Sequence, residues 1–566
     1  DGDIINKSII KNVEYNFGEL DRTRHSELVS VGQIVSNGNL NILGNNFTST
    51  AALTKGDNVA LNVRENVNIG SLKLSGEEKF GSNSENYTSY AFEKNIGSDL
   101  EGKKLTISGN NLNIKGSSVI AENALINTKN VNIVSDVNYE NRESSSKTKT
   151  GFLSSKSSEE KSHEETNSTA NLNVKNKAII KGDVNLVGSN LVLGNDSFVG
   201  GKVTTDSREL HSSYSYKESK KGFSGSIGSG GFSVGYGKSE SKLKEKDLTN
   251  AKSNLVLGDG TVLNKGADIT ATNLIHGQIS INNGDVKFGA RKDIKDVETS
   301  SKSSGVNLSV RIKSQALDRA KQGIDSFKQM KSGDILGGIA SSTNTVTGLV
   351  QGLSSNITKK DGSKATLKDI KDGDFKVNNN FYANAGVNLG FNKSSSNSNS
   401  HSESGVVTTI KGKDENSSIT YNNVKNIEYV GTQAQNTKFI YNNVENITKK
   451  AVELNNYSSS SSRSSGISTG VTIGYGDGVQ TSVDAVKVSA SQSKMNSNGT
   501  TYQNGRFVNV DEVHNNTKNM TLSGFNQEGG TVTGNIQNLT IESKQNTSTT
   551  TGSTKGGSLS IAPNGL

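Results

Sequence analysis

Cysteine and tryptophan are absent from this chain of 566 residues, and its one proline, Pro563, lies near the end. Without cysteine, the chain has neither a disulfide framework nor a thiolate metal site. This absence suits a chain that crosses an oxidising periplasm unfolded, although cysteine is also simply rare in bacterial proteins. Because proline breaks the hydrogen-bonded ladders of β-sheets, its near absence permits long stretches of uninterrupted backbone pairing.

Long apolar segments are also absent. No run of about 18 apolar residues occurs, which excludes a transmembrane helix. Hydrophobic residues make up 30% of the chain, and even with the 61 glycines the apolar share stays below the ~45–50% usual for globular domains. Val, Ile and Thr nevertheless alternate with Asn, Ser and Lys, which favours a thin, ordered, elongated core over disorder. The chain starts at Asp1 without a signal-peptide pattern, so we interpret it as an excised segment of a longer protein.

The net charge of +8 is mild, and the 63 basic residues are interspersed with 55 acidic ones. Such mixing is typical of a solvated surface. Nucleic-acid-binding proteins cluster basic residues around stacking aromatics, but aromatic residues are only 5% of this chain and do not line up with its lysines. We therefore expect no nucleic acid among its partners.

A short repeat is the strongest signal in the sequence. The heptapeptide 421–427 (Tyr-Asn-Asn-Val-Lys-Asn-Ile) returns nearly unchanged at 441–447, twenty residues later. Apolar-polar-apolar triplets recur at spacings of 21, 19 and 19 residues. These pairs are Leu40-Asn41-Ile42 with Leu61-Asn62-Val63, Leu112-Asn113-Ile114 with Val131-Asn132-Ile133, and Met520-Thr521-Leu522 with Leu539-Thr540-Ile541. A fixed period of this length indicates stacked units that cannot bury their apolar faces alone.

The triplets predict a right-handed parallel β-helix, or β-solenoid. In a strand, alternate side chains point to opposite faces, so the two apolar residues of a triplet face inward and the middle one faces out. About twenty residues can hold three short strands, with pairs such as Gly44-Asn45 and Gly109-Asn110 at the corners. Blocks carrying the triplets span about 28–75, 100–138, 169–205, 251–296, 406–455 and 505–545.

Different material separates these blocks and predicts protruding antiparallel β-hairpins. Residues 222–227 and 232–236 form one pair of strands with glycines at the tip, and comparable strands occur at 306–310, 387–391 and 471–475, with a weaker one around 151–153.

A helical period within one interruption predicts a short helical insertion at 314–355, between solenoid domains at 1–313 and 356–566. Leu317, Ala320, Ile324 and Phe327 share one face there. The insertion is either a cap on the solenoid flank or a pair of helices that binds a membrane or a partner.

Besides the triplets, the chain carries Ser/Lys-rich, glycine-tipped hairpins at 138–166, 207–246, 297–312 and 381–403. With both features it resembles the haemagglutinin repeats of filamentous haemagglutinin and of contact-dependent growth inhibition exoproteins. The resemblance implies a protein of two-partner secretion, exported through an outer-membrane transporter and displayed at the bacterial cell surface. It also implies a target-cell receptor or outer membrane as partner, in adhesion or in contact-dependent toxin delivery. The amino-terminal secretion domain and the carboxy-terminal toxin domain of such proteins are missing from this sequence.

The hairpins supply the candidate contact residues, because their apolar residues alternate with glycine and serine as in membrane β-strands. Several hairpins would have to pair with one another to satisfy their backbones in lipid; the alternative is that they lie as separate flaps along the solenoid. The candidates for membrane or partner contact are Phe223, Ile227, Phe232, Val234, Tyr236, Val306, Leu308, Val387, Leu389, Phe391, Val471, Ile473 and Tyr475.

Two other functions are compatible with a β-helix: a purely structural shaft of an adhesin, and an enzyme that degrades polysaccharides. The six histidines are scattered, and neither a His-Glu-x-x-His pattern nor a phosphate-binding loop occurs. Carboxylate pairs such as Glu159-Glu160 lie in Ser/Lys-rich hairpin arms, where they are solubilising charges. We therefore predict no enzyme activity and no catalytic, cofactor-binding or metal-ligating residue.

Overall fold

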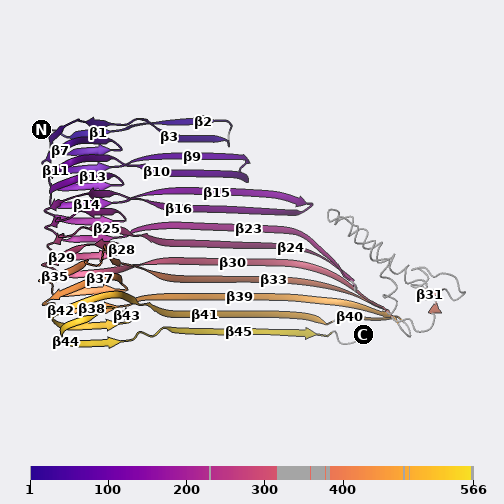
Figure 1. Cartoon of the computed structure of the whole chain (residues 1–566). Helices are drawn as coiled ribbons and strands as arrows, with labels where there is room; N and C mark the ends of the chain where they lie inside the picture. Colours follow the sequence, from indigo (N-terminus) through magenta and orange to yellow (C-terminus); the bar gives the residue numbers. More distant parts are fainter. Residues whose placement is uncertain are drawn as a thin grey trace.

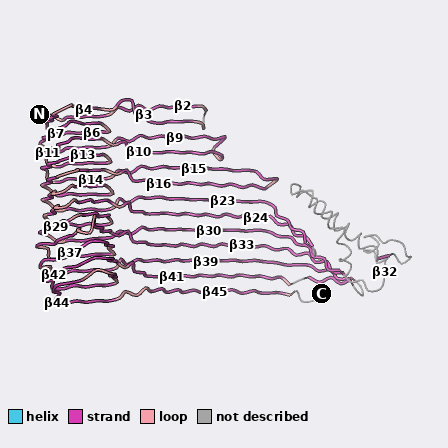
Figure 2. Tube along the Cα trace, viewed as in Figure 1, coloured by secondary structure: helices cyan, strands magenta, loops and turns pink. Residues whose placement is uncertain are grey.

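The computed structural model describes residues 2–18, 20–228, 231–314, 357–358, 376–377, 383–475, 479–483 and 485–562. These residues form a parallel coil of short strands, from one side of which long antiparallel strands extend (Figure 1). The strands account for most of the trace in Figure 2, with loops at the corners of the coil, at the tips of hairpins and where some strands leave the coil. The helical insertion predicted at 314–355 falls outside the described residues except for Ser314, so it stays a prediction, as do the domain boundaries that depend on it.

Each turn of the coil has three sides. In the turn that contains β11 (Asp99–Ser108) and β12 (Asn111–Lys115), β11 supplies two sides and β12 the third. Both strands pair in parallel with the turn before and the turn after. The predicted parallel β-helix is therefore confirmed. Parallel strands need both faces covered, and the coil does this by enclosing one face as its core.

Three parallel ladders run the length of the coil. The first contains β4 (Gln33–Val35), β7 (Leu53–Val63), β11, β13 (Ser118–Asn127), β17 (Asn171–Val174), β20 (Asn190–Leu193), β25 (Ser253–Leu257), β28 (Thr272–His276), β34 (Thr409–Gly412), β37 (Gln433–Asn442), β42 (Gly505–Ser523) and β43 (Phe525–Glu528). The second contains β5 (Asn39–Gly44), β7, β11, β13, β18 (Ala178–Ile180), β21 (Phe198–Val199), β26 (Val262–Leu263), β29 (Gln278–Asn282), β35 (Ser418–Asn422), β37, β42 and β44 (Val532–Glu542). The third contains β1 (Ile4–Lys7), β6 (Phe47–Thr50), β8 (Asn66–Gly70), β12, β14 (Asn130–Val134), β19 (Asp183–Val187), β22 (Val203–Asp206), β27 (Ala267–Thr270), β30 (Val286–Ser314), β36 (Asn426–Val430), β38 (Asn446–Lys450), β42 and β44.

The core is a single apolar column inside the coil. Leu105, Ile107, Leu112 and Ile114 of one turn are buried, whereas the residues between them face out. This alternation repeats in nearly every turn and explains how a chain with few hydrophobic residues folds: each turn needs only a handful of them.

One predicted register is wrong. Leu40 faces Val59 and Ile42 faces Leu61, a spacing of 19 residues, so the sequence comparison with Leu61-Asn62-Val63 was two residues out of step. A shift of two keeps the same side chains inward, and the triplets alone therefore cannot distinguish the two registers. The other three predicted pairings are confirmed, including Tyr421 with Tyr441.

Asparagines on the outside of the coil form ladders of their own. The Asn113 side chain donates to Asn68 in the turn before, at 2.9 Å, and accepts from Asn132 in the turn after, also at 2.9 Å. A similar ladder joins Asn446 to Asn426 at 2.9 Å. Such ladders favour the register in which equivalent asparagines stack, and this is why Asn-rich triplets recur.

The hairpins merge into one continuous antiparallel sheet, rather than lying as separate flaps. Its strands, in order, are β2 (Ile9–Asn16), β3 (Arg22–Ser30), β9 (Leu72–Asn83), β10 (Asn86–Ile96), β15 (Asp136–Gly151), β16 (Ser154–Ser168), β23 (Arg208–Gly228), β24 (Gly231–Ala251), the outer part of β30, β33 (Ala383–Val407), β39 (Val452–Tyr475), β41 (Val486–Gln503) and β45 (Thr547–Ile561). Two short additions are β40 (Val479–Val483), which pairs with the end of β39, and a separate pair, β31 (Ile357–Thr358) with β32 (Lys376–Val377).

The first two hairpins, β2–β3 and β9–β10, were not predicted. Their strands are short, and they lack the Ser/Lys-rich arms by which the later hairpins were recognised. The hairpin strands lengthen from 8 residues in β2 to 25 in β33 and shorten again to 15 in β45, so the later strands extend farther from the coil than the first ones (Figure 1).

Candidate interaction face

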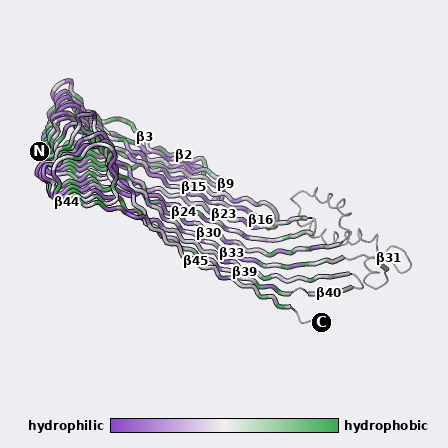
Figure 3. The backbone as a smooth tube through the Cα atoms, turned by 60° about the horizontal axis from the view of Figure 1, so that its bottom comes forward, coloured by the Kyte–Doolittle hydropathy of each residue, from purple (hydrophilic) through white to green (hydrophobic). Residues whose placement is uncertain are grey.

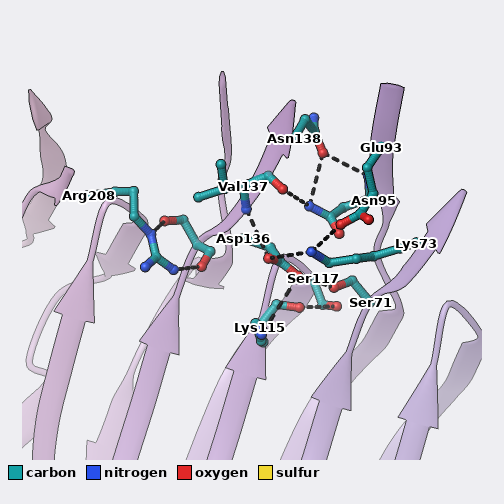
Figure 4. Close-up of polar contacts among 11 residues, drawn as sticks. Ser71, Lys73, Glu93, Asn95, Lys115, Ser117, Asp136, Val137, Asn138 and Arg208 are labelled. Carbon is teal, nitrogen blue, oxygen red and sulfur yellow. Dashed lines mark hydrogen bonds and ion pairs between the residues drawn. The ribbon is translucent and has the colours of Figure 1, made fainter. Parts of the chain in front are cut away.

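The sheet is anchored where its strands leave the coil (Figure 4). Asp136, the first residue of β15, is nearly buried there. Its carboxylate accepts hydrogen bonds from Ser71 Oγ and from the backbone N–H of Val137, both at 2.9 Å. The ammonium groups of Lys73 and Lys115 lie 4.0 and 3.9 Å away. These contacts compensate a carboxylate that would otherwise be costly to bury.

A repeated asparagine clamp joins neighbouring hairpins at this level. The backbone and side-chain nitrogens of Asn95 both donate to Asn138 Oδ1, at 2.7 and 2.9 Å. Asn250 makes the same two bonds to Asp293 Oδ1, at 2.8 and 3.0 Å. Each side chain also donates to the carbonyl oxygen just before its partner, at 3.1 and 2.8 Å. The clamp therefore sets successive hairpins side by side in a fixed register.

Beyond the clamps, the long strands are polar on both faces and are joined by pairs of hydroxyl groups. Ser301 lies 2.6 Å from Ser396 across β30 and β33, and Ser464 lies 2.6 Å from Ser491 across β39 and β41. Small hydroxyl side chains stabilise cross-strand pairs without requiring a second layer to cover them. This polar zone lets the sheet extend as a single layer away from the coil.

The distal part of the sheet changes character. Directly paired residues in an antiparallel sheet point to the same face, so a row of partners can be followed across the strands. One such row is apolar on seven successive strands: Phe223, Tyr236, Val306, Phe391, Ile467, Val488 and Leu559. Two further rows on that face contain Val234, Leu308 and Leu389, and Ile227, Phe232, Val310, Val387 and Val471. Together with Val486 and Ile561, which pair with each other, these residues form what we call the apolar band.

Most of the apolar band is exposed, although Val310 in its distal row is buried. Phe391 and Ile467, partners in its first row, are each 50% exposed, and Leu559 at the edge is 60% exposed. The opposite face of the same strands carries Ser224, Asn307, Asn388 and Ser468, which are small or polar. Figure 3 shows the hydrophobic segments recurring towards the distal ends of the long strands. An exposed apolar surface of this extent is typical of an interaction site.

Cations border the apolar band on its coil-facing side. Lys221, Lys238 and Lys393 lie two residues from the first row on their strands and therefore on the same face. One row further in, Lys302, Arg463 and Lys555 share that face with Glu240. All six basic side chains are exposed. The face thus has an apolar distal part and a basic margin.

Comparison with known proteins bears directly on this region. Residues 389–557 match the profile of the hemagglutinin repeat, from the strand that carries Leu389 and Phe391 to the last hairpin strand. This segment is similar to the hemagglutinin repeat family. No curated protein and no solved structure matches the chain.

The match confirms the resemblance for the C-terminal part of the sheet and coil. A hemagglutinin repeat points to a structural segment of an adhesin rather than to an enzyme. Within the described residues, His, Asp and Glu do not gather in threes that could hold a metal ion. In that same part of the chain there is no helix with the length and apolarity needed to span a membrane.

The structure brings the sequence-predicted contact residues together. Phe223, Ile227, Phe232, Val234, Tyr236, Val306, Leu308, Val387, Leu389, Phe391 and Val471 all belong to the apolar band. Ile473 and Tyr475 lie further along β39, where they pair with Ala385 and Ala383 of β33. Whether these side chains contact a membrane or a partner stays a prediction.

Sequence reasoning missed Val310, Ile467, Val486, Val488, Leu559 and Ile561. Each alternates with small or polar residues, as in Val486-Lys487-Val488, but the runs are short. They are identified by the residues that they pair with on neighbouring strands. The sequence of a single strand does not contain this information.

Proposed function

We propose that this chain is a segment of a secreted bacterial surface adhesin, whose apolar band contacts the outer membrane of a target cell. The observation that carries the proposal is the first apolar row, which continues without a break across seven paired strands from β23 to β45. The hemagglutinin repeat supports secretion and display at the cell surface, with an outer-membrane transporter of two-partner secretion as the export partner. Contact with the target membrane is the step that adhesion and contact-dependent toxin delivery share.

The backbone hydrogen bonding of the sheet is compatible with contact between the apolar band and lipid. Interior strands of the band, such as β30 and β33, have both backbone edges paired, so their polar groups are already satisfied. At the margins, the distal end of β23 and the outer edge of β45 each have one side without a partner strand among the residues that the structure describes. An unpaired edge is costly in hydrocarbon. We therefore infer that the sheet lies face-on against the lipid surface with its side chains immersed, rather than crossing the bilayer.

The basic margin supports the same orientation. When Phe391 and its neighbours enter the acyl region, Lys393 and Lys302 lie at the level of the headgroups on the same face. Lipid phosphates attract basic side chains near a membrane surface by about 1 kcal/mol each. The face therefore fits an anionic lipid surface, with apolar and electrostatic contacts side by side.

Flotation of the full chain with vesicles that contain an anionic phospholipid tests the proposal. Leu308→Ser with Leu389→Ser removes one cross-strand pair from the band, and Asn307→Ser with Asn388→Ser changes the opposite face of the same two strands. Because a leucine side chain gains ~1.5–3 kcal/mol on full burial, we expect the band variant to bind at least about tenfold more weakly. The opposite-face variant should bind like the unaltered chain. Equal binding by both variants would reject the proposal.

A further inference from the structure

A charged cluster lies inside the last turns of the coil, remote from the apolar band. Lys449 of β38 and Glu512 of β42 are fully buried, and their Nζ and Oε1 atoms are 2.6 Å apart. Gln527 of β43 completes the cluster: its Nε2 donates to Glu512 Oε2 at 2.8 Å, and its Oε1 accepts from Lys449 Nζ at 3.2 Å. The three side chains come from the three sides of the coil and meet at its axis.

Aromatic rings enclose this cluster. The Lys449 ammonium lies 4.7 Å from the centre of the Phe507 ring and 6.0 Å from that of Phe525. The hydroxyl of Tyr441, also fully buried, donates to Glu512 Oε1 at 3.1 Å. Only Gln527 is partly exposed, because its strand is the last one described in its ladder. The Lys449 amine and the Glu512 carboxylate are therefore shielded from water, whereas the Gln527 side chain is partly exposed to solvent.

A simple buried ion pair does not account for the arrangement. Burying two charges costs several kcal/mol per ion, and an apolar pair of similar volume usually does as well or better. Here one oxygen of the Glu512 carboxylate accepts from the Lys449 amine and the other accepts from the Gln527 amide. The carboxylate therefore holds the amine next to the amide. A nucleophile, an acyl group and a shared proton carrier are what amide exchange needs.

We propose that Lys449 and Gln527 form an intramolecular isopeptide bond, with Glu512 as the proton carrier. The neutral amine of Lys449 attacks Cδ of Gln527 and forms the new C–N bond. Glu512 takes the proton that the amine loses and delivers it to the departing Nε2, so that the Cδ–Nε2 bond breaks and one ammonia leaves. The carboxylate is regenerated, no oxidant or reductant is consumed, and the reaction occurs once per chain.

The protonation states suit this step. Burial lowers the pKa of the Lys449 amine, which favours the neutral, nucleophilic form. Burial acts to raise the pKa of Glu512, but the charge of Lys449 and hydrogen bonds from Lys449 and Gln527 hold that pKa below its ordinary value. Both directions agree with the step: the neutral amine attacks Cδ of Gln527 while Glu512 is ionised and can take the proton that the amine loses.

Such a bond would act as a staple for a chain without cysteine. It would join residues 78 positions apart and close a covalent loop around the β39–β41 hairpin. It would also link two sides of the coil near its C-terminal end. Unlike a disulfide, an amide is not cleaved by thiols, so the staple would persist in any redox environment. The inference stands independently of the proposed membrane contact.

Intact-mass spectrometry of the denatured full chain tests the inference directly. We expect the chain to be lighter than its sequence mass by one ammonia, and a tryptic digest to contain one branched species that joins residues 439–450 to residues 519–544. Glu512→Gln should restore the sequence mass, whereas Glu445→Gln, at an exposed carboxylate, should leave the branched species intact.

Two results would overturn the inference. One is a folded, unaltered chain with its full sequence mass and with separate, unmodified peptides around Lys449 and Gln527. The other is a loss of ammonia that maps elsewhere, for example to an asparagine followed by glycine. Because the unaltered chain itself gives the decisive mass, the test does not depend on whether the Glu512 variant folds.

Discussion

Tyr421 and Tyr441 lie one above the other in successive turns of the coil, with ring centroids 5.3 Å apart and planes inclined by 10°. Both rings are fully buried. The hydroxyl of Tyr429 bridges them from another side of the coil, 3.0 Å from Tyr421 Oη and 2.9 Å from Tyr441 Oη. The repeated tyrosines of the heptapeptide are therefore core residues, and their hydroxyl groups form a continuous chain of hydrogen bonds in the interior.

Removing the bridging hydroxyl should destabilise this part of the coil. Tyr429→Phe leaves the ring in place but takes a hydrogen-bond partner from two buried hydroxyls, and an unsatisfied buried group costs about 1–3 kcal/mol. We expect denaturant unfolding, followed by tyrosine fluorescence, to shift by a free energy in this range. Tyr15→Phe, at an exposed tyrosine of β2, is the matched control and should unfold like the unaltered chain. A Tyr429 variant as stable as the control would contradict the role assigned to the bridge.

The asparagine ladders make a graded prediction. Asn113→Ala removes one donated and one accepted side-chain bond in the middle of a ladder, whereas Asn538→Ala removes only the bond that Asn538 donates to Asn519. At about 1 kcal/mol per bond, the first change should cost roughly twice the second. Thermal unfolding monitored by circular dichroism measures both. Equal costs would show that side-chain stacking in the ladder is not additive.

Acid should weaken the coil at His276. Burial lowers the pKa of this histidine to about 4, and its ring bonds to Gly277 O at 2.7 Å and to Thr437 Oγ1 at 3.0 Å. Because the folded-state pKa lies below the unfolded one, the neutral ring stabilises the fold above about pH 6.5, and this stability is lost as the pH falls towards 4. The full loss is on the order of 3 kcal/mol.

Urea unfolding at pH 7 and at pH 4 tests this linkage. His276→Gln should lose less stability on acidification than the unaltered chain, since glutamine does not titrate. His211→Gln, at an exposed histidine of β23, should keep the full pH dependence. If both variants retain it, another buried group is responsible.

The asparagine clamp predicts a local effect without global unfolding. Asn95→Ala deletes both side-chain bonds from β10 to β15 and leaves Asn138 Oδ1 with the bond from the backbone N–H at position 95. We expect hydrogen exchange to accelerate at the base of the β9–β10 hairpin, while exchange in the coil strands β11 and β12 stays slow. Asn86→Ala, at the tip of that hairpin, should not accelerate exchange at its base.

The basic margin predicts a salt dependence of membrane binding. Lys302→Gln with Lys393→Gln should weaken binding to anionic vesicles by about 2 kcal/mol at low salt, and the difference should shrink as salt rises. Lys411→Gln, on the coil, should have no effect. Vesicles without anionic lipid should bind the double variant and the unaltered chain alike. A salt-independent difference would contradict an electrostatic role for this margin.

Much of the fold was predictable because each turn of the coil repeats a local pattern. The buried pair Leu112 and Ile114 and their partners Val131 and Ile133 are recognisable as a triplet and its copy. The hairpin at Phe223 and Tyr236 was predictable from alternation and glycines.

Three kinds of feature were not predictable. Registers related by a shift of two bury the same residues, so Leu40 was matched to the wrong partner. The pairing of strands distant in the sequence was also not predictable. Val306 pairs with Phe391, for example, although the two residues lie 85 positions apart. The buried cluster of Lys449, Glu512 and Gln527 gave no signal either, since each residue alone resembles a surface residue.

The unequal lengths of the hairpins also bear on how the chain acquires its fold. Asn273 follows Asn254 in its ladder after 19 residues, but Thr409 follows Asn273 only after 136. Closing the longer loop costs about 2 kcal/mol more in chain entropy. Each finished turn serves as the template for the next, so growth from the N-terminus should be rapid up to β29 and β30 and should then pause. The kinetics of folding are thus set by the longest hairpin, and a chain arrested at this pause would present an unfinished coil end to its surroundings.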